Sequence, residues 1–98
     1  MQNTESNTGW KESTACLCLS EQITIENLSA LIKQQSWLKL PVQMADFSQV
    51  KKADSAILAV LLAWNDVLDH KLKVKNVPAE LLTLVDLYDL QDVFEFID

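Results

Sequence analysis

The stretch MADFSQVKKADSAILAVLL, residues 44–62, contains the pattern that decides the fold. Its first part ends an apolar segment, residues 42–47, where we predict a strand. Its second part begins a segment rich in Ala and Leu, residues 54–70, which is the strongest helix prediction in the chain. Asp54 or Ser55 can cap the open N-terminus of this helix. The stretch therefore joins a strand to a helix through a short turn.

Short strands alternate with helices in the rest of the chain. In chain order we predict strands at residues 10–12 and 15–19, a helix at 24–35 with Thr24 as its N-cap, a strand at 72–77, a helix at 79–88 that begins at Pro78, and one more turn or short helix at 90–98. This order predicts an α/β fold with parallel crossovers and an N-terminal hairpin. The length of 98 residues suits one domain, which we place at residues 9–98 after a polar tail, residues 1–8, expected to be disordered.

The composition excludes several classes of function. Gly9 is the only glycine, so the glycine-rich loops that bind nucleotide phosphates are absent. Eight basic residues, all lysine, against fourteen acids give a net charge of −6, which argues against nucleic-acid binding. The longest apolar run, residues 56–64, is half the length of a membrane-spanning helix, so no direct membrane insertion is expected. The first residues lack the pattern of a secretory signal, and we expect a cytoplasmic protein.

No arrangement of residues indicates catalysis, a metal or a cofactor. Cys16 and Cys18 are too few ligands for zinc, and we interpret them as small buried hydrophobic residues. His70 has no Ser or Cys placed beside it by a recognisable pattern, and it suits a helix end. Asp46 and Asp54 occupy positions where a strand end and a helix cap favour Asp. We therefore predict that the chain is not an enzyme.

The central helix carries more apolar surface than one face of a helix needs. One arc contains Leu58, Leu61, Leu62 and Leu68, and an adjoining arc contains Ile57, Val60, Trp64 and Val67. The second arc can be buried against a neighbouring helix, or it can stay exposed until a partner covers it. The helical wheel alone is consistent with both.

Residues 44–62 resemble the signature of the STAS domain family. That signature is a strand that ends in Asp-hydrophobic-Ser, here residues 46–48, and then Asp-Ser or Asp-Thr opening a Leu-rich helix, here Asp54 and Ser55. The resemblance extends over about residues 9 to 95. It implies a small mixed sheet of four to five strands with helices packed mainly on one face.

The resemblance also implies a function. Residues 61–64 and 76–90 are similar to STAS proteins that form the small cytoplasmic subunit of an ABC transporter, which moves phospholipids between the membranes of Gram-negative bacteria and maintains outer-membrane lipid asymmetry. Such a subunit has no cofactor and docks on the transporter's ATPase, within a complex that includes an inner-membrane permease. The same family includes anti-sigma factor antagonists, in which the Ser of the Asp-Ser pair is phosphorylated. That alternative implies phosphorylation of Ser55.

In the family the start of the central helix faces the partner, which implies that the second arc points outward and the first inward. The partner contacts that the resemblance implies are Lys52, Asp54, Ser55, Ala56, Ile57, Val60 and Trp64. STAS helices commonly carry Gly at the position of Ile57. We expect this bulky side chain to block a close approach to Ser55, and so to favour a permanent apolar docking surface over a kinase switch.

Overall fold

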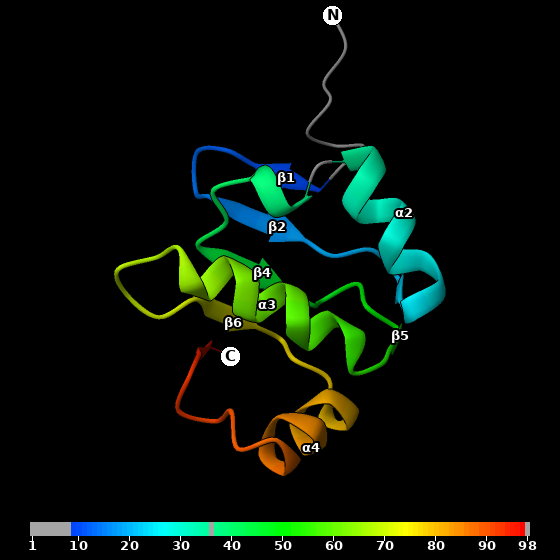
Figure 1. Cartoon of the computed structure of the whole chain (residues 1–98), viewed down its shortest axis with the longest axis vertical. Coiled ribbons are helices and arrows are strands. Elements are labelled where there is room, and N and C mark those ends of the chain that lie inside the picture. Colours follow the sequence, from blue (N-terminus) through cyan, green and yellow to red (C-terminus); the bar gives the residue numbers. More distant parts are fainter. Residues whose placement is uncertain (1–8, 36, 98) are drawn as a thin grey trace, which may run out of the picture.

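A five-stranded mixed sheet forms the centre of the computed structural model, which describes residues 9–35 and 37–97 (Figure 1). The predicted tail at residues 1–8 lies outside the described residues. Within them the strands are β1 (Trp10–Lys11), β2 (Cys16–Cys18), β4 (Met44–Asp46), β6 (Lys73–Lys75) and β7 (Glu95–Ile97), in the spatial order β1-β2-β4-β6-β7. β1 and β2 pair antiparallel as the predicted hairpin, and the other pairs are parallel. The predicted α/β fold is confirmed.

Three α-helices of the described part of the chain follow these strands. They are α2 (Ile25–Gln35), α3 (Ala56–Asp66) and α4 (Ala79–Leu87), and a short 3₁₀ helix, η1 (Trp37–Lys39), follows α2. In Figure 1 α3 lies in front of β4 and β6, with α2 on one side of it and α4 on the other. The core forms between α3 and the sheet because Leu17, Ala45 and Val74 lie opposite one another on adjacent strands and are buried.

A two-stranded parallel sheet, which the sequence did not predict, sits beside the central one. It pairs β3 (Gln22–Ile23) with β5 (Lys52–Ala53). Each of these strands leads within three residues to the first residue of a helix, α2 after β3 and α3 after β5. The pairing therefore brings the N-termini of α2 and α3 together, although they lie about 30 residues apart in sequence.

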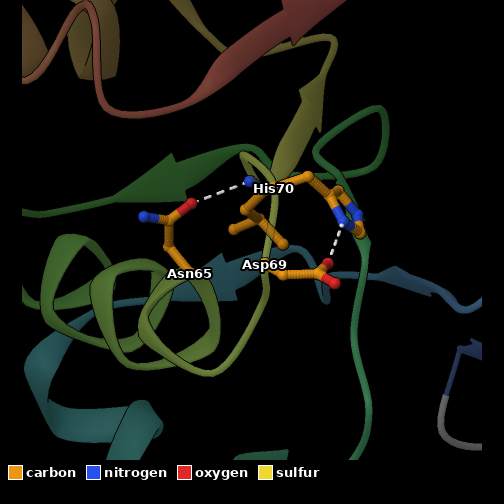
Figure 2. A network of polar contacts seen from close by, with 4 residues as sticks. Asn65, Asp69 and His70 are labelled. Atoms are coloured by element: carbon orange, nitrogen blue, oxygen red, sulfur yellow. Dashed lines mark hydrogen bonds and ion pairs between the residues drawn. The ribbon is translucent and has the colours of Figure 1, made fainter.

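The central helix is shorter than predicted. It was expected to run to residue 70, but α3 ends at Asp66 and Val67 is its C-cap. The side-chain oxygen of Asn65 accepts a hydrogen bond from the backbone N–H of Leu72 at 2.7 Å (Figure 2). This hydrogen bond joins the end of α3 to the residue before β6.

The same loop holds the only histidine of the chain. His70 Nδ1 lies 3.0 Å from Asp69 Oδ1 (Figure 2). Both side chains are exposed. The hydrogen bond with His70 lowers the pKa of the Asp69 carboxyl from its ordinary value. His70 therefore sits in an exposed loop, beyond the end of the helix that was expected to include it.

The end of the chain contains the predicted further turn, at residues 91–93, but ends in a strand and not in a helix. Residues 95–97 form β7, which adds to the sheet parallel to β6. Phe94 is buried and anchors this strand, and its ring meets that of Phe96 edge-on with centroids 6.3 Å apart. The helix prediction failed because packing on β6 outweighs a local pattern that is too short to define a helix.

Candidate functional site

The carboxylate of Asp54 holds the N-termini of two helices. Its Oδ1 accepts a hydrogen bond from the N–H of Ala56 at 3.0 Å, at the start of α3. Its Oδ2 accepts one from the N–H of Ile25 at 2.9 Å, at the start of α2. Both N–H groups belong to first turns, where backbone donors lack partners within the helix and the helix dipole favours a negative charge. One side chain therefore fixes α2 relative to α3.

Ser55 takes the N-cap position of α3 but does not cap it with its side chain. Its backbone has helical angles, φ −66° and ψ −13°, and its side chain makes no cap hydrogen bond. The residue is exposed. Of the two caps that the sequence allowed, Asp54 provides the side-chain hydrogen bond at the start of α3. The Ser55 hydroxyl therefore remains on the surface.

An apolar groove opens between α2 and α3 beside Ser55. Its volume is about 380 Å³, and it is lined by Ile25, Leu28, Ser29, Ile32, Lys33, Ala56, Ala59 and Val60. Ile25 is 67% exposed at one end of the groove. Ala56, Ala59 and Val60 form its α3 wall, and the two small alanine side chains allow another backbone to approach closely. We call this surface the α2–α3 groove.

The predicted orientation of the central helix is wrong for Leu62 and for most of the second arc. Ile57 and Trp64 are 0% and 2% exposed and form no free surface for a partner. Val60 is 4% exposed and reaches the surface only as part of the lining of the α2–α3 groove. Leu62, which was placed inside, is 39% exposed, whereas Leu58 and Leu61 are buried as predicted. Val67, which was placed outside, is 77% exposed, also as predicted. Most residues of both arcs are buried because α3 packs between the sheet on one side and α2 with η1 on the other.

Trp64 has a specific reason for its burial. Its indole Nε1–H donates a hydrogen bond to the backbone carbonyl of Trp37 at 2.9 Å. The two rings pack with centroids 6.1 Å apart. Trp37 lies in η1, which no periodic pattern indicated. The sequence therefore provided no reason to expect Trp37 as the partner of Trp64.

Ile57 also points into the core and not toward Ser55. Because its side chain has no exposed surface, it cannot block a partner that approaches the Ser55 hydroxyl. The expectation that Ile57 weakens a kinase switch is therefore wrong.

Four of the predicted contact residues do gather at one place. Lys52 is exposed on β5, Asp54 joins the two helices, and Ser55 and Ala56 follow it at the start of α3. Sequence reasoning missed Ile25, which belongs to this place through its hydrogen bond to Asp54. No local signal could have included it, because the link depends on the pairing of β3 with β5.

The Asp-Phe-Ser part of the signature has a structural role. Asp46 Oδ1 accepts hydrogen bonds from the Ser48 N–H at 2.9 Å and from the Asn76 side chain at 3.2 Å, and Cys18 Sγ lies 3.8 Å from Oδ2. Partial burial opposes ionisation of Asp46, but the hydrogen bonds from Ser48 and Asn76 outweigh it and lower the carboxyl pKa. Asp46 thus ties the ends of β2, β4 and β6 together.

The two cysteines lie on the sheet as free thiols. Cys16 is buried and Cys18 is partly exposed. Burial raises the pKa of the Cys16 thiol. Over residues 9–35 and 37–97, no group of three or more His, Cys, Asp or Glu side chains is placed to hold a metal ion. In that same part of the chain, no helix has the length and apolar character needed to cross a membrane.

Comparison with known proteins identifies the family. A family model described as "Mlab, STAS domain" matches residues 6–97, which is nearly the whole chain. Comparisons with individual curated proteins and with solved structures gave no match. The match covers the strand-turn-helix signature, the Asp54 cap and the α2–α3 groove. The chain belongs to the STAS domain family, in its MlaB-like group.

Proposed function

We propose that this protein is a non-catalytic subunit that docks on the ATPase of an ABC phospholipid transporter and supports its assembly or activity. STAS domains are typically binding modules. The description of the matching family model supports the MlaB-type role. Such a subunit would work at the cytoplasmic side of the inner membrane, held there by the transporter and its permease, and would contribute to lipid asymmetry of the outer membrane.

The observation that carries the proposal is the α2–α3 groove beside Ser55. An apolar side chain of the ATPase could fill the groove and cover Ile25, which is 67% exposed. Full burial of a side chain of this size is worth about 1.5–3 kcal/mol, which makes Ile25 a candidate anchor of the interface. Lys52, which lines a neighbouring hollow together with Ile25 and Asp54, could pair with an acidic residue of the ATPase.

The geometry favours binding over catalysis. Both oxygens of Asp54 already accept backbone hydrogen bonds, so the carboxylate is occupied in joining helices. Ser55 precedes α3 and His70 follows it, and this eleven-residue helix is about 16 Å long. The exposed serine and the histidine therefore form no nucleophile–base pair.

Copurification with the ATPase tests the proposed surface. Ile25→Arg and Ala59→Arg each place a long charged side chain at the groove, and we expect both variants to lose the ATPase from a pull-down. Val67→Arg is the matched control, because Val67 is an exposed aliphatic residue outside the groove lining. Retention of the ATPase by both groove variants, or equal loss by the control, would contradict the proposal.

A second candidate function is that of an anti-sigma factor antagonist. The exposed Ser55, whose side chain makes no cap hydrogen bond, favours it because a kinase needs such a hydroxyl. A phosphate there would add negative charge beside Asp54 and the apolar groove, and would oppose docking. Mass spectrometry after incubation with an anti-sigma kinase distinguishes the two: stoichiometric phosphate on the wild type and none on Ser55→Ala supports the switch.

A further inference from the structure

One charged side chain, that of Lys33, lines the α2–α3 groove. The other lining residues are apolar except for Ser29, and none of them is acidic. Lys33 lies in the last turn of α2 and is exposed. No ion pair joins it to another of the described residues. The groove therefore presents a positive charge that no carboxylate of the described chain neutralises.

This positive charge is opposite in sign to the net charge of the whole chain. Fourteen acids and eight lysines give a net charge of −6. A helix dipole favours a cation at any position of the last turn, so it accounts for a lysine at this end of α2. It does not account for the position of Lys33 on the side of that turn that borders the groove. We therefore ask what the charge does for a molecule bound in the groove.

The opposite end of the groove has no such preference for one sign of charge. Ile25 marks that end, eight residues before Lys33 and about 12 Å from it along the axis of α2. The hollow beside Ile25 is lined by Lys52 but also by Glu26 and Asp54. Because both signs of charge meet there, only the end at Lys33 selects a partner by charge.

A partner that covers the groove removes water from its lining. Leu28 and Val60 form the buried floor, and they are each 4% exposed. A charged side chain that loses water without gaining a partner weakens binding, and two like charges brought together weaken it further. A wholly apolar or a basic segment would leave Lys33 in one of these situations. An acidic side chain placed beside the apolar contact would pair with it.

We propose that the segment of the ATPase that fills the α2–α3 groove is amphipathic and carries an Asp or Glu that forms an ion pair with Lys33. An apolar side chain of the same segment covers Ile25, so the carboxylate and this anchor lie about 12 Å apart, as Lys33 and Ile25 do along α2. This inference rests on the proposed function, and it adds the chemistry and the orientation of the bound segment.

The test is the affinity of the full chain for the ATPase, measured by biolayer interferometry at 0.15 M salt. Lys33→Glu should weaken binding by about tenfold or more, because it replaces attraction by repulsion. Lys33→Arg keeps the charge and should stay within about twofold of the wild type. Lys71→Glu is the matched control, since it makes the same change in net charge at an exposed residue that does not line the groove. It should also stay within about twofold.

Rescue by the partner separates an ion pair from a structural effect. Lys33→Glu also removes a cation from the last turn of α2, which weakens that helix slightly. A change in the ATPase would not repair such a loss. Among variants of the ATPase in which single surface Asp or Glu residues are replaced by Lys, one should restore binding to Lys33→Glu and weaken binding to the wild type.

The outcomes distinguish this inference from the proposed function. If Ile25→Arg loses the ATPase while Lys33→Glu keeps wild-type affinity, the groove is the docking surface but the ion pair does not form. If both variants keep wild-type affinity, the proposed function fails as well. Equal weakening by Lys71→Glu, or the absence of any rescuing ATPase variant, also overturns the ion pair. A dimer of this chain that Lys33→Glu dissociates in analytical ultracentrifugation would instead assign the groove to a second copy.

Discussion

The Asp54 carboxylate and the backbone N–H of Ile25 form a 2.9 Å hydrogen bond across 29 residues of sequence. The same carboxylate caps α3 through Ala56. Since α2 and α3 form the two walls of the α2–α3 groove, this link sets the relative position of the walls. The Asp of the Asp-Ser signature thus shapes the proposed docking surface without having to contact the partner.

Replacing Asp54 should destabilise the fold through two helix caps at once. We expect Asp54→Ala to lower the free energy of unfolding by about 2 kcal/mol, since loss of one cap costs about 1 kcal/mol. Asp54→Asn should cost less, because its amide oxygen can still accept one of the two hydrogen bonds. Urea denaturation followed by circular dichroism measures both.

Hydrogen exchange tests whether the destabilisation by Asp54→Ala includes loss of the hydrogen bond that links α2 to α3. The Ile25 amide should exchange faster in Asp54→Ala than in the wild type, and Asp66→Ala, at the exposed C-terminal end of α3, is the control. Unchanged protection of Ile25 in Asp54→Ala would show that the link between the helices does not form.

Trp64 should behave as a core residue. Trp64→Ala removes a side chain that is 2% exposed and a hydrogen bond to Trp37, and should cost about 3–5 kcal/mol of unfolding free energy. Leu62→Ala, on an exposed position of the same helix, should cost less than about 1.5 kcal/mol. If Trp64→Ala kept wild-type stability and lost only partner binding, the outward orientation first expected for this residue would be right after all.

The pH dependence of stability should contain a contribution from Asp46. Its pKa is lowered in the folded chain from the ordinary value of 3.8, so folding is favoured by its ionised form. That stability is complete well above pH 3.8 and is lost as the pH falls through the lower folded pKa. Denaturation from pH 7 to pH 2 should show a smaller acid-induced loss for Asp46→Asn than for the wild type. An identical loss in the two proteins would contradict the hydrogen bonds of Asp46 with Ser48 and Asn76.

Gly9, the single glycine, allows the chain to pass close to the backbone of Cys18. Gly9 has φ +78°, and a Cβ built there would overlap the carbonyl oxygen of Cys18. We expect Gly9→Ala to lower the unfolding free energy by about 1–3 kcal/mol by straining the β1–β2 pair. Ser13→Ala, in the exposed turn of the same hairpin, is the control and should change it by less than about 0.5 kcal/mol. Equal stability of Gly9→Ala and the wild type in urea would contradict the close approach of β1 to β2.

The sequence predicted those features that depend on neighbouring residues. The strands β4 and β6, the start of α3 at an Asp cap and the hairpin at β1–β2 all follow from local patterns. The orientation of α3 did not, because it depends on Trp37 of η1, which reaches Trp64 from a segment without periodicity. The role of Ile25 and the strand β7 were missed for the same reason, since each depends on a pairing between distant segments.

Hydrogen exchange of this chain, alone and bound to the ATPase of the transporter, tests the proposed docking surface most directly. We predict slower exchange on binding in residues 25–33 and 54–60, which form the α2–α3 groove and its N-terminal end. Val67→Arg should show the same protection, and Ala59→Arg should show none. A complex that forms at full occupancy without protection in either of these two segments would contradict the proposal.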